Sequence, residues 1–313
     1  MIKKYLPGYV LALAGLGACS LPVSSTGNSA LQVLDYHVIP RTAFNGITIT
    51  ELSGLAWDED EQLLYGLSDR GRIYHFRLRI EDELIRDVTP VYAAHLADRK
   101  GRLLSGRESD SEGLLALNAN NGRKGDTQLV MAFERRPHLA RFTPQGREVA
   151  EIPVPEPLQA INHYRNDNNA LESVAWHPEY GFITAPEEPL IGQPRNLHTL
   201  YALKKRWSFM AYPAPNSSIT ALEFMPGTRS LIVLERAWSG FPNPMVNSLR
   251  RVHLDRCSEA GTCPVENLQV FSSSFSIDNF EGLTHIRDNL YLMVSDDGEN
   301  DLLRTLLTLF KIK

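Results

Sequence analysis

Hydrophobic residues along the chain follow the two-residue period of β-strands rather than the period of helices. From residue 31 to the C-terminus, short runs of alternating or β-branched apolar residues recur, and Gly, Pro, Asn and Asp separate them. No segment of the sequence keeps apolar residues at helical spacing for three turns. The pattern therefore predicts an all-β fold.

A short module recurs five times along this pattern, with copies that start at Ser53, Glu112, Glu172, Thr220 and Glu281. A second apolar strand that ends in an acid follows each copy, and a third strand usually comes next. Three or four antiparallel strands per repeat are typical of a β-propeller blade. We therefore predict a β-propeller. Five blades are favoured, six are the alternative, and a two-sheet sandwich is the competing architecture.

Both ends of the folded region also have strand patterns. Residues 31–40 predict a strand before the first module, and residues 306–310 predict a strand at the end of the last one. The N-terminal strand can then complete the last blade and close the ring, which hides both sheet edges. We expect residues 31–313 to form a single propeller domain.

The modules place acids at two points of every blade. Because the first two strands of a blade are antiparallel neighbours, the start of the first lies beside the end of the second. Around the propeller, these positions predict a ring at one mouth of the central channel, and eight of the ten are carboxylates. The pairs are Ser53 with Asp69, Glu112 with Glu134, Glu172 with Glu187, Thr220 with Glu235, and Glu281 with Asp296.

Such crowding requires positive charge, because neighbouring carboxylates raise one another's pKa. One source is internal, since Arg70, Arg135 and Arg236 directly follow strand-ending acids. The other is a hard divalent cation, with Ca²⁺ as the expected ion because it prefers oxygen ligands. Its candidate ligands are Asp69, Glu112, Glu134, Glu172, Glu187, Glu235, Glu281 and Asp296. Alternatively, the acids and arginines only lock adjacent blades together.

The N-terminus has the pattern of an export signal. Its apolar run is too short to span a membrane, which takes about 20 residues. The ending Leu16-Gly17-Ala18-Cys19 resembles a bacterial lipobox, which implies cleavage before Cys19 and lipid attachment to its sulfur. We expect a lipoprotein signal peptide at 1–18 and a lipidated flexible tether at 19–30. The protein would then face the periplasm, anchored to the outer membrane of the cell envelope. A plain signal peptide is the alternative.

The charge balance of the chain excludes one class of partner. The 313 residues include 32 Lys and Arg against 37 Asp and Glu, without a basic block, so nucleic acid is not an expected partner.

Cys257 and Cys263 flank a Gly-containing turn. In an exported chain this close pair predicts a local disulfide, since the histidines that a metal site would need are missing from the segment.

Several short motifs, in order, resemble the phytase-like domain family labelled "esterase-like activity of phytase". They are Leu52-Ser53-Gly54-Leu55, Leu67-Ser68-Asp69-Arg70-Gly71, Asp110-Ser111-Glu112-Gly113-Leu114, Phe133-Glu134-Arg135, Leu171-Glu172-Ser173 and Leu234-Glu235-Arg236. The resemblance runs from about residue 50 to the C-terminus. It implies a β-propeller and suggests hydrolysis of phosphoesters or esters. Propeller phytases place Ca²⁺ ions and basic side chains at a channel mouth, where they hold phosphate and activate water.

Two functional hypotheses follow for the acidic mouth. In the first, Glu112, Glu172 and Glu281 are catalytic, and cation-activated water attacks a small phosphorylated or ester substrate. Arg70, Arg135 and Arg236 would then neutralise the bound phosphate. In the second, the propeller is not catalytic and binds a protein or glycan of the envelope, with a purely structural ring of acids and arginines.

Overall fold

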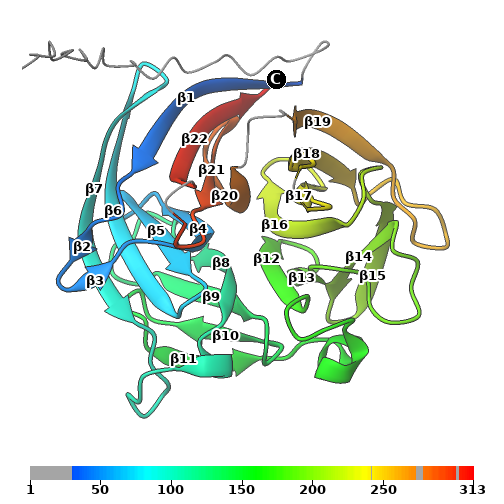
Figure 1. The fold of residues 1–313 in the computed structure, drawn as a ribbon, viewed down its shortest axis with the longest axis horizontal. Helices are drawn as coiled ribbons and strands as arrows, with labels where there is room; N and C mark the ends of the chain where they lie inside the picture. Colours follow the sequence, from blue (N-terminus) through cyan, green and yellow to red (C-terminus); the bar gives the residue numbers. More distant parts are fainter. Residues whose placement is uncertain (1–29, 241, 273–277, 301–302) are drawn as a thin grey trace, which may run out of the picture.

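The computed structural model describes residues 30–240, 242–272, 278–300 and 303–313. The predicted signal peptide and the predicted lipidation site Cys19 lie outside these residues. Within the described residues, the chain forms five antiparallel sheets of four strands each, arranged as blades around a central axis (Figure 1). The prediction of a five-bladed propeller is confirmed.

Each blade is built in the order that the sequence predicts, from the axis outward. The first blade contains β4 (Leu52–Asp58), β5 (Leu63–Ser68), β6 (Arg72–Glu81) and β7 (Leu84–His95). The second contains β8 (Ser111–Leu117), β9 (Gln128–Phe133), β10 (His138–Phe142) and β11 (Glu148–Ile152). The third contains β12 (Leu171–His177), β13 (Gly181–Pro186), β14 (Leu197–Ala202) and β15 (Lys205–Met210). The fourth contains β16 (Ser217–Met225), β17 (Ser230–Ala237), β18 (Val246–His253) and β19 (Val265–Ser272).

The fifth blade joins the two ends of the described chain. It contains β20 (Asn279–Arg287), β21 (Leu290–Asp296), β22 (Thr305–Ile312) and, on its outside, β1 (Leu31–Ile39). Strand β1 pairs with β22 from Leu31 opposite Ile312 to Ile39 opposite Thr305. The N-terminal strand therefore closes the ring, as predicted (Figure 1).

The short elements lie between blades. They are the hairpin of β2 (Ala43–Phe44) and β3 (Ile47–Thr48), and the 3-10 helices η1 (Gly106–Glu108), η2 (Glu156–Leu158) and η3 (Ile161–His163). Among the described residues, no helix has the length and apolar character needed to cross a membrane.

The hydrophobic core is divided among the interfaces between neighbouring blades. Alternate residues of one strand point to opposite faces of its sheet, so each strand serves two interfaces. In β9, for example, Val130 and Ala132 pack against the third blade, whereas Leu129 and Met131 pack against the first. Because apolar residues on both faces of each sheet are buried, the core forms a ring of interfaces between neighbouring blades.

The first hairpin of every blade contains a β-bulge at the same point. The pairing register shifts between Leu52 and Gly54, Ser111 and Leu114, Leu171 and Ser173, Ile219 and Ala221, and Phe280 and Gly282. These bulges contain the five positions at which the modules start. A bulge re-aims the side chains around it, which places the module starts at one mouth of the channel.

Small residues next to the bulges allow the inner strands to approach closely. A Cβ atom on Gly54 would lie 2.8 Å from the backbone oxygen of Glu112, and one on Gly113 would lie 2.8 Å from the Cα of Ser173. Beside them the channel narrows to a cavity of about 10 Å³, about the space of one water molecule. The acidic mouth is therefore closed on its inner side.

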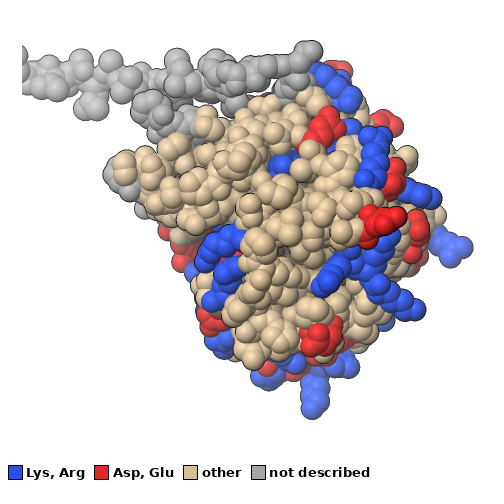
Figure 2. All heavy atoms as spheres, turned by 90° about the vertical axis from the view of Figure 1, so that its right-hand side faces the viewer, with Lys and Arg blue, Asp and Glu red and all other residues tan. Residues whose placement is uncertain are grey.

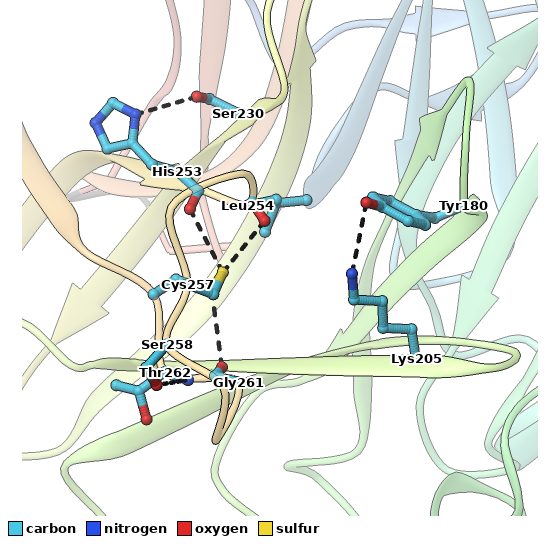
Figure 3. The surroundings of a disulfide bond; sticks show 10 residues. Tyr180, Lys205, Ser230, His253, Leu254, Cys257, Ser258, Gly261 and Thr262 are labelled. Carbon is cyan, nitrogen blue, oxygen red and sulfur yellow. Dashed lines mark hydrogen bonds between the residues drawn. A yellow bond between two sulfur atoms is a disulfide. The ribbon is translucent and has the colours of Figure 1, made fainter.

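The predicted disulfide between Cys257 and Cys263 is present in the connection from β18 to β19 (Figure 3). The same loop pairs with β15 of the third blade, because the Ser208 amide donates to Gly261 O at 2.8 Å and the Cys263 amide donates to Ser208 O at 2.7 Å. The disulfide therefore braces the outer edges of two blades, away from the channel.

The flank of the molecule drawn in Figure 2 has basic and acidic side chains next to one another, with uncharged residues over much of the surface between them. No basic block covers this face.

Candidate functional site

The strand pairing identifies the residues that occupy equivalent places at the mouth. At the end of the second strand, the amides of Asp69, Glu134 and Glu187 donate to backbone oxygens two residues before the respective module start. Asp296 pairs with Asn279 in the same way in the fifth blade. In the fourth blade the equivalent residue is Arg236, which pairs with Ser218.

The prediction that Glu235 belongs to the acidic ring is therefore corrected. Glu235 pairs with Ile219, so its register differs by one residue from that of the strand-ending acids in the other blades. A shift of one residue turns a strand side chain to the opposite face of the sheet. The ring position of the fourth blade is basic instead of acidic.

Glu235 has a separate, fully buried environment. Its carboxylate accepts hydrogen bonds from Arg250 at 2.9 Å and from the Tyr212 amide at 2.9 Å, and it lies 3.3 Å from His198 Nε2. Burial raises the pKa of Glu235, but the contacts with His198, Arg250 and the Tyr212 amide outweigh it and hold the pKa below its usual value. This carboxylate is a structural link between the third and fourth blades.

The acids of the second and third blades come together. Carboxylate oxygens of Asp110, Glu112 and Glu134 lie within 4.8 Å of one another, and so do those of Glu134, Glu172 and Glu187. The two groups share Glu134. We call these five residues the acidic cluster.

Crowding and burial act on the protonation of these groups. The pKa values of Glu112 and Glu172 are raised well above the usual range, first by burial and then by neighbouring carboxylates. The same causes raise the pKa of Glu134 to about 8. Without a cation, Glu134 therefore retains its proton at neutral pH, and ionisation of Glu112 and Glu172 is disfavoured.

Arg236 partly compensates the acids on the other side of the mouth. Its guanidinium donates to Glu187 Oε1 at 2.6 Å and to Glu281 Oε1 at 2.6 Å, and thus joins the third blade to the fifth. Burial and the nearby Asp296 raise the pKa of Glu281 to about 8 despite Arg236. The Arg236 side chain is 23% exposed, so this pair is largely withdrawn from solvent.

Arg70 and Arg135 lie at the rim and make their shortest ion pairs with acids outside the predicted ring, and Arg70 also lies 3.9 Å from Asp69 of that ring. Arg70 donates to both oxygens of Glu51, at 2.8 and 2.9 Å, and Arg135 lies 2.8 Å from Asp110. Both arginine side chains remain about half exposed. Glu51 and Asp110 were not among the predicted site residues, although each comes two residues before a module start, which is a signal in the sequence.

Ser53 and Thr220, the two bulge positions without an acid, have a matching structural role. Ser53 Oγ donates to Ser111 O at 2.9 Å, and Thr220 Oγ1 donates to Phe280 O at 3.1 Å. Each hydroxyl therefore bonds to the backbone of the next blade. The mouth is asymmetric, with bulge acids in the second, third and fifth blades only.

Two carboxylates of the cluster receive no hydrogen bond from the part of the chain that the structure describes. Within the described residues, no donor bonds to the carboxylate of Glu112 or Glu172, although both are buried. Asp69 Oδ1 is also buried without a hydrogen bond among these residues, and burial together with the neighbouring Glu51 raises the pKa of Asp69 to about 7. Crowded carboxylate oxygens of which some have no hydrogen-bond donor are suited to a hard cation.

Comparison with known proteins gives a matching family model and similar solved structures. A family model described as "Phytase-like: Esterase-like activity of phytase" matches residues 47–299. No curated protein matches the chain. A solved structure titled "Structure of Dos1 propeller" is similar with a TM-score of 0.37 and 9% identity, over 83% of this chain and 67% of that one.

Proposed function

This chain belongs to the phytase-like family, and on that premise we propose that its acidic mouth is a cation-dependent site that hydrolyses small phosphoesters or esters. The observation that carries the proposal is the crowding of carboxylate oxygens within 4.8 Å in two groups that share Glu134, one with Glu112 and the other with Glu172. A bound divalent cation would remove the cost of crowding them, because it stabilises their ionised forms.

The acidic cluster fits Ca²⁺ in ligand type. Ca²⁺ takes about six to eight oxygen ligands, and carboxylates serve as one or two of them each. Asp110, Glu112, Glu134, Glu172 and Glu187 would hold it. When bound, such a cation polarises a phosphoryl or carbonyl oxygen and lowers the pKa of bound water.

The rim arginines have donors available for a substrate. Arg70 uses Nε and Nη2 for Glu51, and Arg135 uses Nε for Asn168 and Asp110, so other guanidinium N–H groups of both side chains are not engaged by the described residues. Arginine donors suit the oxygens of a phosphoryl group. We assign substrate binding to Arg70 and Arg135. Buried Arg236 is a positioning residue that fixes Glu187 and Glu281.

Hydrolysis also requires a proton for the leaving group. The oxygen of water forms the new bond to phosphorus or to the carbonyl carbon and gives up a proton, the ester P–O or C–O bond breaks, and the leaving oxygen takes a proton, so that no net proton is consumed. Glu281 suits this task. Its Oε1 is held by Arg236 and Asn279, whereas Oε2 accepts no hydrogen bond within the described residues, so a pKa of about 8 leaves the proton on Oε2.

Melting and turnover of the purified full chain test the proposal together. We expect Ca²⁺ to raise the melting temperature relative to EDTA, because a ligand stabilises the state that it binds. Hydrolysis of 4-nitrophenyl phosphate or 4-nitrophenyl acetate should stop in EDTA and in Glu172→Gln. The matched control is Glu81→Gln, an exposed acid of β6, which should behave as the wild type. Full turnover by Glu172→Gln would refute the site.

The competing function is a non-catalytic propeller that binds an envelope protein or glycan. It is favoured by the engagement of Arg70, Arg135 and Arg236 in ion pairs with acids of the mouth. In that case Ca²⁺ should leave the melting temperature unchanged and neither ester should turn over, whereas loss of Arg236 should still destabilise the fold.

The proposed location is the outer membrane, through a lipid on Cys19. We expect the full chain to fractionate with membranes and Cys19→Ala to fractionate with the soluble periplasmic proteins. A wild-type chain found in the soluble fraction would contradict the anchor.

A further inference from the structure

A hollow of about 430 Å³ lies at the boundary of the third and fourth blades. One wall comes from the segment that follows β13, and the other from the segment between β15 and β16. Its lining includes Met210, Ala211, Tyr212, Pro213 and Pro215. We call it the apolar hollow.

The apolar hollow adjoins the acidic mouth through both walls. Glu188 in one wall directly follows Glu187 of the acidic cluster, and Ser217 in the other begins the strand whose bulge contains Thr220. The two walls are joined where the Ile219 amide donates to Glu187 O at 2.9 Å. The hollow therefore lies beside the place where Arg236 bonds to Glu187.

Two exposed apolar residues lie in or near the wall of this hollow. Met210 is 49% exposed although it lies at the end of a strand, and Trp238 is 49% exposed. The backbone oxygen of Trp238 accepts a hydrogen bond at 3.1 Å from the side chain of Asn216, which lines the hollow, so the backbone of Trp238 lies near it. At the polar end, Arg195 pairs with Glu188 at 2.8 Å. Large apolar groups left uncovered beside a charged site are typical of a ligand-binding surface.

We propose that the apolar hollow binds an aryl or acyl group of the substrate while the phosphoryl or ester group lies over the acidic mouth. This inference rests on the proposed function and names its substrate class, which is a monoester with an apolar substituent. A densely charged polyphosphate would gain nothing from a wall of Met210, Pro213 and Pro215. An aryl or acyl group would be removed from water there, which favours its binding. The two prolines hold the wall in shape before binding.

Two phosphonates that are not hydrolysed test the binding directly. In calorimetric titrations of the full chain with Ca²⁺, we expect phenylphosphonate to bind about tenfold more tightly than methylphosphonate. Ala214→Trp, which fills the hollow, and Met210→Gln, which makes its wall polar, should remove this preference. Leu203→Gln is the matched control, since Leu203 is an equally exposed apolar residue in the turn between β14 and β15, outside the hollow.

Turnover gives a second measurement. The ratio of kcat/KM for 4-methylumbelliferyl phosphate to that for glycerol 2-phosphate should fall about tenfold in Ala214→Trp and remain at the wild-type value in Leu203→Gln. Equal affinity for the two phosphonates, or a preference that survives Ala214→Trp, would overturn the inference whether or not the protein is an enzyme. A preference lost in Ala214→Trp, without turnover of either ester, would uphold the hollow and reject the hydrolase.

Discussion

Arg236 is the residue on which the charge balance of the mouth depends. It compensates Glu187 and Glu281 at once, at 2.6 Å each, and is mostly buried. Removing one partner of a buried ion pair leaves an uncompensated charge, which costs about 3 kcal/mol. We expect Arg236→Met to lower the free energy of unfolding by about that amount in urea titrations.

The control for Arg236 is Arg79→Met, because Arg79 and its partner Glu81 are both exposed. Exposed ion pairs contribute less than about 1 kcal/mol. Equal losses in Arg236→Met and Arg79→Met would show that the mouth does not depend on this guanidinium.

The pKa values of the carboxylates predict how stability depends on pH when no cation is bound. Folding raises the pKa of Glu134 and Glu281 from 4.5 to about 8. Below pH 8 the folded state therefore keeps protons that the unfolded state has lost, and this stabilisation disappears as the pH rises through about 8. In EDTA we expect the free energy of unfolding to fall between about pH 4.5 and 8, by about 1.4 kcal/mol per pH unit for each retained proton, and to level off above about pH 8.

Ordinary histidines also titrate within this window, so variants of the carboxylates are needed to assign the slope. Glu134→Gln and Glu281→Gln should each flatten the slope, and Ca²⁺ should remove the part that comes from Glu134, since a cation favours the ionised form of its carboxylate ligands. A stability that rises with pH in EDTA would contradict the protonated state of the mouth.

At the scale of the element, the repeated feature is the bulge and the small residue beside it. Gly113 follows Glu112 in β8, and a Cβ at this position would meet the Ser173 backbone at 2.8 Å. We expect Gly113→Val to push β8 away from β12, which separates Glu112 from Glu172. The free energy of unfolding should fall by about 2 kcal/mol, and the Ca²⁺-dependent rise in melting temperature should shrink.

Leu115→Val, two residues further along β8 and only half-buried, is the control and should keep the response to Ca²⁺. If Gly113→Val also kept it, the close approach of the inner strands would have no part in cation binding.

At the scale of the whole molecule, the closure of the ring by β1 determines stability. This strand pairs along its length with β22 and buries Leu31 and Ile39. A chain that lacks residues 1–39 would expose the edge of β22, and we expect its melting temperature to fall by about 10 °C. A chain that lacks only residues 1–29 should melt as the full chain does.

A synthetic peptide of residues 31–39 should restore part of the loss, because it can pair with the open edge of β22. An unchanged melting temperature after removal of residues 1–39 would mean that the fifth blade is stable without its outer strand.

Much of the site could be predicted from the modules, because each module start is covalently tied to a strand. Glu112 and Glu172 were placed at the mouth from sequence alone, and the structure brings them into adjoining groups. Glu235 was misplaced because Glu235 and Arg236 are neighbours at the end of one strand, and their order alone does not say which one faces the channel. The pairing of Ser218 with Arg236 decides it.

The sequence by itself determined the strand class, the five modules, the closure by residues 31–40 and the disulfide, because these depend on local periodicity and on residues close in the chain. Only the tertiary structure decided which acids lie together, which arginine is buried and where the apolar hollow opens. These features depend on the register of each strand pair and on approaches between blades. A shift of one residue reverses the direction of a side chain while leaving the apolar pattern unchanged.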